Sequence, residues 1–121
     1  MKIMIVDDHQ GIRLVLKKHL ELAISDQYEV IECESGEEAV KEYMLHDPNC
    51  VLMDFELIQM NGYQASEIIL RQDPKAKIIM VTSHDILSMR KKAAKLPIVD
   101  FVSKENLSEL APILNTLLNK K

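Results

Sequence analysis

The sequence has no tryptophan and only two cysteines and three glycines among its 121 residues. No Cys/His cluster has zinc spacing, which excludes a thiolate metal site, and we expect Cys33 and Cys50 to be buried and reduced. No run of Lys or Arg stands out and the net charge is −4, which argues against nucleic-acid binding by this chain alone. No signal peptide is visible, and apolar runs such as Ile78–Val81 are too short to span a bilayer. We therefore expect a cytoplasmic protein with no membrane association.

What is present is enough apolar material for one core. Hydrophobic residues make up 47% of the chain and charged residues 28%, so we expect residues 1–121 to form a single domain. Apolar runs alternate with segments of helical periodicity from end to end. The expected strands cover residues 2–6, 28–33, 50–53, 77–81 and 98–102. The expected buried stripes are Ile12, Val15, Leu16, Leu20 and Ala23 in the first helix, and Ala39, Val40, Tyr43 and Met44 in the second.

Capping signals mark two of the helices. Ser35 and Glu38 have the spacing of a capping box at the start of the second helix. Asn106 with Glu109 predicts a cap for the last helix. Pro112 lies inside the apolar stripe of that helix and removes a backbone donor, which predicts a kink there or a helix that begins near it.

Five strand–helix units predict an α/β fold with helices on both faces of a parallel sheet. The third and fourth strands are continuous apolar runs, as strands buried on both faces should be. The fold class we predict is a doubly wound five-stranded parallel sheet, (βα)5, with the flavodoxin-like order 2-1-3-4-5.

Polar side chains follow the strands at the edge where such folds bind ligands. Asp7 and Asp8 follow the first strand, Asp54 the third, Thr82 the fourth and Lys104 the fifth. Three close carboxylates repel one another unless a cation intervenes, and a hard ion with oxygen ligands, Mg²⁺, is the natural candidate. One carboxylate could then act as a nucleophile toward a phosphoryl group while Mg²⁺ and Lys104 neutralise charge.

These residues resemble the receiver domain of two-component response regulators, and the resemblance covers essentially the whole chain. Each matching piece is weak alone, but together, in order and at the family's spacing, they are specific. The pieces are residues 3–9, residues 51–54, Gly62, residues 78–83 and residues 101–104.

The resemblance implies a phosphorelay receiver that requires Mg²⁺. Asp54 looks like the phospho-acceptor and a metal ligand. Asp8 would bind Mg²⁺ directly, Asp7 would bind it through water, and the backbone carbonyl of Glu56 would be a further ligand. The phosphoryl donor would be a histidine kinase or a histidine phosphotransfer protein.

The resemblance also implies a switch. The Thr82 hydroxyl and the Lys104 ammonium would bind phosphoryl oxygens, and Phe101 would turn inward as Thr82 moves, although the same position suits an ordinary half-buried aromatic. The output would be a changed surface on the fourth helix, fifth strand and fifth helix, read by a partner or by a C-terminal effector domain absent from this chain. Glu56 and His84 occupy positions that would tune phosphate lifetime.

Two departures from the family pattern keep an alternative open. Ile58 replaces a usual proline, and Glu105 replaces the proline that usually follows the lysine. A receiver-like interaction module that is never phosphorylated is therefore the second hypothesis. A phosphatase or phosphomutase with an aspartyl nucleophile would usually show Asp-x-Asp where residues 54–56 read Asp-Phe-Glu. A flavin carrier would need a Ser/Thr/Gly-rich loop where this chain is acidic.

Overall fold

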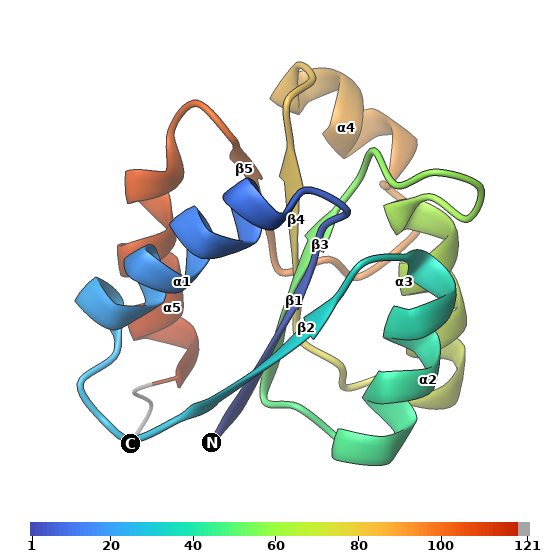
Figure 1. The fold of residues 1–121 in the computed structure, drawn as a ribbon. Coiled ribbons are helices and arrows are strands. Elements are labelled where there is room, and N and C mark those ends of the chain that lie inside the picture. The colour runs from blue at the N-terminus through green and yellow to red at the C-terminus, as the bar shows by residue number, and fades with distance from the viewer. Residues whose placement is uncertain (119–121) are drawn as a thin grey trace.

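The fold is a twisted parallel sheet between two layers of helices (Figure 1). The computed structural model describes residues 1–118. The strands are β1 (Lys2–Val6), β2 (Glu29–Cys33), β3 (Cys50–Asp54), β4 (Ile78–Thr82) and β5 (Asp100–Ser103), all parallel and in the order β2-β1-β3-β4-β5. The helices are α1 (Gln10–Ala23), α2 (Gly36–His46), α3 (Gly62–Gln72), α4 (Ile86–Lys92), the 3₁₀ helix η1 (Leu107–Glu109) and α5 (Leu110–Leu118). The predicted fold class and strand order are confirmed.

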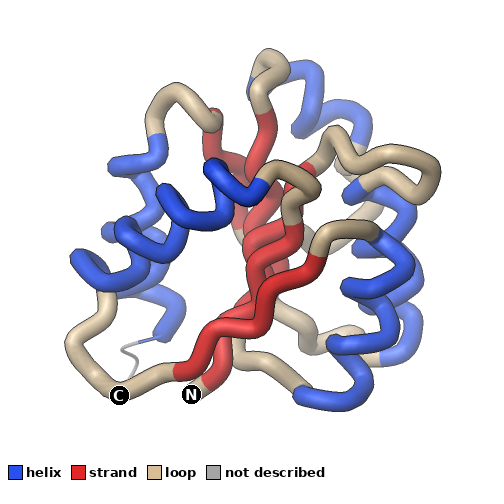
Figure 2. The backbone as a smooth tube through the Cα atoms, in the orientation of Figure 1, coloured by secondary structure: helices blue, strands red, loops and turns tan. Residues whose placement is uncertain are grey.

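Two hydrophobic cores lie on opposite faces of the sheet, which Figure 2 shows nearly edge-on. Met4 and Val6 of β1 face the core formed with α2 and α3, whereas Ile3 and Ile5 face the core formed with α1 and α5. This alternation follows from the two-residue period of a strand. β3 and β4 are buried throughout and β1 is buried from Ile3 onward, so the carboxyl ends of these three central strands are fixed with respect to one another.

Two expected core positions are wrong. Val15 is 40% exposed and Met44 is 53% exposed. In α1 the buried side chains include Leu16 and Leu20, and in α2 Tyr43 is buried. Adjacent helical residues point about 100° apart, so a stripe inferred from hydrophobicity alone includes neighbours that lie outside the packed face.

The helix caps match the prediction in part. Ser35 Oγ accepts a hydrogen bond from the Glu38 N–H at 3.1 Å, as a capping box requires. The Glu38 carboxylate, however, accepts from the N–H of Glu34, one residue earlier than the box predicts. A complete capping box, which the sequence reading did not identify, joins Asn61 and Gln64 at the start of α3.

The predicted cap at Asn106 is wrong. Its side chain makes no capping hydrogen bond, because the tight turn of η1 brings the Glu109 N–H onto the backbone carbonyl of Asn106 at 3.1 Å. Of the two alternatives for the proline, a helix that begins nearby is confirmed, since α5 starts at Leu110 and Pro112 lies in its first turn.

The two cysteines are free and buried, as expected. They lie on strands that are not neighbours, Cys33 at the end of β2 and Cys50 at the start of β3. Burial raises the pKa of both thiols to about 12, so both are protonated packing groups at neutral pH. Among residues 1–118, no helix combines the length and the apolar composition that a bilayer crossing requires.

Candidate functional site

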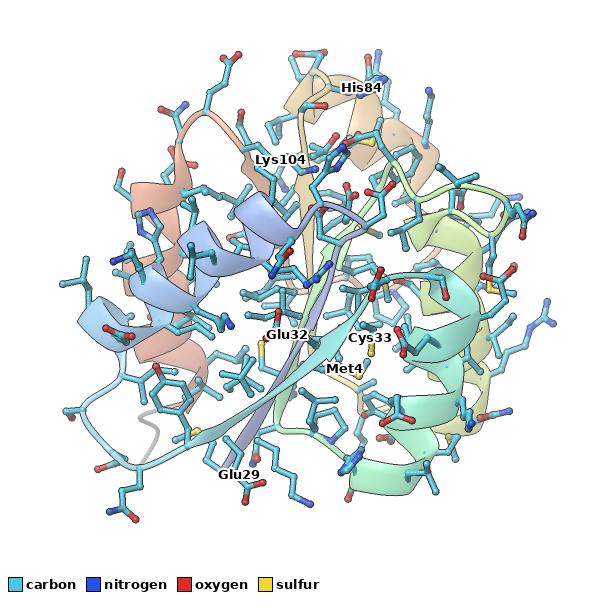
Figure 3. The ribbon with its side chains drawn as sticks, viewed as in Figure 1. Met4, Glu29, Glu32, Cys33, His84 and Lys104 are labelled. Atoms are coloured by element: carbon cyan, nitrogen blue, oxygen red, sulfur yellow. The ribbon has the colours of Figure 1, made fainter. Side chains whose placement is uncertain are left out.

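The carboxyl edge of the sheet brings acidic and basic side chains together. Asp7 directly follows β1, Asp54 and Thr82 are the last residues of β3 and β4, and Lys104 directly follows β5. The ammonium Nζ of Lys104 lies 3.0 Å from Asp7 Oδ2 and 3.1 Å from Asp54 Oδ1. In Figure 3, Lys104 and His84 are at the same end of the sheet, opposite Glu29. The topology thus joins residues almost 100 positions apart in sequence.

Burial makes this cluster electrostatically costly. The side chains of Asp7 and Asp54 are 1% and 2% exposed. Burial, with the neighbouring Asp7 carboxylate, raises the pKa of Asp54 to about 6, although the Glu56 N–H and Lys104 oppose the rise. Burial alone would lower the pKa of Lys104, but Asp54 and Asp7 together raise it above its ordinary value. At neutral pH the site therefore holds an ionised Asp54 carboxylate beside a charged Lys104 ammonium.

The first acid pair has spare oxygen atoms. Asp7 Oδ2 and Asp8 Oδ1 are buried and accept no hydrogen bond, although Lys104 Nζ and His9 Nδ1 each lie 3.0 Å from one of them. Ligand atoms of Asp7, Asp8 and His9 lie within 4.8 Å of one another. Carboxylate oxygens without hydrogen-bond donors suit a hard divalent cation, so the residues present fit Mg²⁺. His9 is the N-cap residue of α1.

Glu56 makes contacts that the sequence did not predict. Its carboxylate accepts hydrogen bonds from the Thr82 hydroxyl and from the N–H and hydroxyl of Ser83, the latter two at 3.2 Å. His84 Nδ1 lies 2.9 Å from Oε2, and Lys104 Nζ lies 3.9 Å from Oε1. Burial would raise the pKa of Glu56, but these donors and cations outweigh it and lower the pKa below its usual value. Glu56 is therefore an anion bound to the ends of β4 and β5.

Gly62 packs closely against the end of β3. Its N–H donates to the Phe55 carbonyl at 3.0 Å, which holds the start of α3 against the end of β3. A Cβ atom at this position would lie 2.2 Å from the Asp54 carbonyl oxygen and 2.8 Å from Phe55 Cα. Only a residue without a side chain permits this approach of two backbone segments.

Arg13 is a second supporting residue, and the sequence reading missed it. Its guanidinium Nη1 donates to the Asp7 carbonyl at 2.7 Å, and its Nε donates to Glu32 Oε1 at 2.8 Å. Arg13 is buried, and it ties α1 to β2 and to Asp7, the residue that directly follows β1. An arginine between the apolar positions Ile12 and Leu16 was the available signal.

Phe101 and two loops lie near the charged cluster. Phe101 is half-buried against the core on the α2–α3 face, with the Arg90 guanidinium 5.3 Å from its ring centroid, an arrangement compatible with a core aromatic and with a switch. Ile58 is exposed, and Gln59 has a left-handed φ of 66° in the loop after β3. The Lys104–Glu105 peptide is trans, as is every peptide bond in the described part of the chain.

Comparison with known proteins identifies the family of the chain. Residues 3–115 match the response regulator receiver domain family. The chain is 36% identical over 105 residues to chemotaxis protein CheY of Listeria monocytogenes, covering 86% of each protein, and 36% identical over 104 residues to CheY of Thermotoga maritima, covering 85% of this chain and 84% of that one. A two-component response regulator of the LuxR family from Aurantimonas has a similar structure, with a TM-score of 0.83, 28% identity, and coverage of 99% of this chain and 86% of that one.

The chain therefore belongs to the response regulator receiver domain family. The protein is a CheY-like receiver of the two-component type. Receivers of this type are signalling modules and not conventional enzymes.

Proposed function

We propose that residues 1–121 form a single cytoplasmic receiver domain that accepts a phosphoryl group on Asp54 in an Mg²⁺-dependent reaction. The donor would be the phosphohistidine of a sensor kinase or of a phosphotransfer protein. The observation that carries this proposal is the Lys104 ammonium, which lies within 3.1 Å of both Asp7 and Asp54 at the buried carboxyl edge of the sheet.

The proposed reaction is a displacement at phosphorus. A carboxylate oxygen of Asp54 attacks, the bond from phosphorus to the donor nitrogen breaks, and the imidazole leaves with the electron pair. Because the pKa of Asp54 is raised only to about 6, the group is ionised and nucleophilic at pH 7. Lys104 is positioned to neutralise an oxygen of the arriving group.

The oxygens of Asp7, Asp8 and Asp54, with the backbone carbonyl of Glu56, would hold Mg²⁺. The bound ion supplies positive charge that offsets the carboxylates and the transferred phosphoryl group. The buried oxygens Asp7 Oδ2 and Asp8 Oδ1, which accept no hydrogen bond, support this ligand set.

After transfer, the Thr82 hydroxyl would bind a phosphoryl oxygen, and Phe101 would turn inward behind it. The output would be a changed α4–β5–α5 surface, recognised by a downstream partner or by an effector domain. We propose that Glu56 and His84, which lie beside Thr82, tune the lifetime of the phosphorylated state through access of the attacking water.

The test is intact mass spectrometry after incubation with Mg²⁺ and acetyl phosphate. The proposal expects one added phosphoryl group, absent in Asp54→Asn and absent with a chelator. Asp26→Asn, which removes an exposed carboxylate next to β2, is the matched control and should be phosphorylated like the wild type. A wild type without an adduct would refute the proposal and support the alternative of a silent interaction module.

A further inference from the structure

The Glu56 carboxylate lies on the groups that the proposed reaction assigns to the phosphoryl group. It accepts hydrogen bonds from the Thr82 hydroxyl and from the Ser83 N–H, and it lies 3.9 Å from the Lys104 ammonium. His84 holds the same carboxylate from the outer side, with Nδ1 at 2.9 Å. An anion with this set of donors resembles a bound phosphoryl group in its charge and its contacts.

The Thr82 hydroxyl cannot serve both anions. A hydroxyl has one proton to donate, and here that proton is directed to Glu56. Its oxygen also accepts the His84 N–H at 2.9 Å, so the hydroxyl is held from both sides. Thr82 is completely buried, so its hydroxyl does not hydrogen-bond to bulk water instead. Contact between Thr82 and a phosphoryl oxygen requires that the Glu56 bond break first.

Charge opposes simultaneous occupancy as well. Glu56 is ionised, and a phosphoryl group beside Lys104 would bring further negative charge into the same partly buried space. Two anions that share one ammonium repel each other more strongly where water is scarce. The Glu56 side chain, which is 22% exposed, has room to move outward into solvent.

We propose that Glu56 is an internal occupant of the phosphoryl position, an autoinhibitory contact that must open before Asp54 can be phosphorylated. The inference rests on the proposed function, but it concerns the forward reaction rather than phosphate lifetime. The unphosphorylated protein then divides between a closed form, with Thr82 bonded to Glu56, and an open form that accepts the donor. The observed rate scales with the open fraction.

The test compares rates of phosphorylation by acetyl phosphate with saturating Mg²⁺, followed by intact mass. Glu56→Ala removes the competing anion and keeps the backbone carbonyl, so the rate should rise about tenfold, which corresponds to about 1.4 kcal/mol. Glu56→Gln keeps an acceptor oxygen for Thr82 but loses the charge, and should give an intermediate rate. Glu105→Gln, which removes an exposed carboxylate beside Lys104 without touching Thr82, should leave the rate unchanged.

A structural readout accompanies the rates. In the unphosphorylated protein, the amide resonances of Ser83 and His84 should shift in Glu56→Ala and remain in place in Glu105→Gln. Thermal unfolding of each variant confirms that it is folded. Phosphorylation of wild type with equal or slower reaction of both Glu56 variants would overturn the inference and leave the proposed function intact. Phosphorylation of wild type with faster reaction of Glu56→Ala would support the inference, and a wild type without an adduct would overturn both.

Discussion

Replacement of Gly62 by alanine tests the packing that positions Asp54. At a helix residue without a positive φ, this change ordinarily stabilises a protein by ~0.4–1 kcal/mol. Here the new Cβ would lie 2.2 Å from the Asp54 carbonyl oxygen. Real Cβ atoms essentially never come closer than 3.0 Å to another heavy atom, so the two atoms must separate by about 0.8 Å. The three atoms nearest the new Cβ, all within 3.0 Å, are backbone atoms of Asp54 and Phe55, so the strand end itself has to shift. We expect Gly62→Ala to destabilise by ~1–3 kcal/mol, the usual cost of overpacking.

Gly11→Ala is the matched control. It lies in α1, and an added Cβ meets no atom within 4 Å, so the change should be neutral or stabilising. Urea unfolding separates the two, because a change of ~2 kcal/mol shifts the midpoint by roughly 1 M at typical m-values. The Gly62→Ala protein should also be phosphorylated more slowly than wild type, because the substitution displaces Asp54. A Gly62→Ala protein as stable as Gly11→Ala would refute the packing argument.

Further predictions concern charge and lifetime. Without Mg²⁺, the raised pKa of Asp54 means that the folded state holds a proton more tightly than the unfolded state, so stability is lost as pH rises from about 4 to about 6. Asp54→Asn should therefore be more stable than wild type at pH 7.5 and lose this advantage near pH 4 in urea titrations. A difference in unfolding free energy that does not change between these pH values would contradict the raised pKa of Asp54. Arg13→Ala should cost ~1.5–3 kcal/mol, because it deletes a buried charged hydrogen-bond donor, whereas the more exposed Lys17→Ala should cost less than ~1 kcal/mol; similar urea midpoints would argue against it. His84→Ala and Glu56→Ala should change the dephosphorylation rate measured after donor removal, and unchanged rates in both would exclude the tuning role.

Strand order and the meeting of the charged groups were predictable because both follow from chain-level rules. Alternating strands and helices with right-handed crossovers leave few topologies, and parallel strands place their carboxyl ends at one edge. Asp7, Asp54 and Lys104 therefore had to lie near one another if the strands were assigned correctly. Errors of one or two residues at the strand ends, such as a fifth strand expected at Ile98 and found at Asp100, did not disturb this result.

The contacts that depend on side-chain rotamers were not predictable. Nothing in the sequence spacing of Glu56 and Thr82 indicates that the first accepts a hydrogen bond from the second. Glu56 lies in the loop after β3, whereas Thr82 is the last residue of β4. The Arg13 contact likewise requires a helix phase that brings its guanidinium onto the end of β1. Exposure at Met44 and the missing side-chain cap at Asn106 show the same limit: local pattern fixes the element, whereas neighbouring elements decide which atoms meet.

The most direct test of the central claim locates the phosphoryl group on the chain. The phosphorylated protein is reduced with borohydride, which converts an aspartyl phosphate to homoserine, and is then digested and sequenced by mass spectrometry. We expect homoserine at position 54 in samples with Mg²⁺ and acetyl phosphate, with aspartate retained at positions 7 and 8. Homoserine at either of those positions, or aspartate retained at all three in a protein that gained a phosphoryl group, would contradict the assignment of Asp54 as the acceptor.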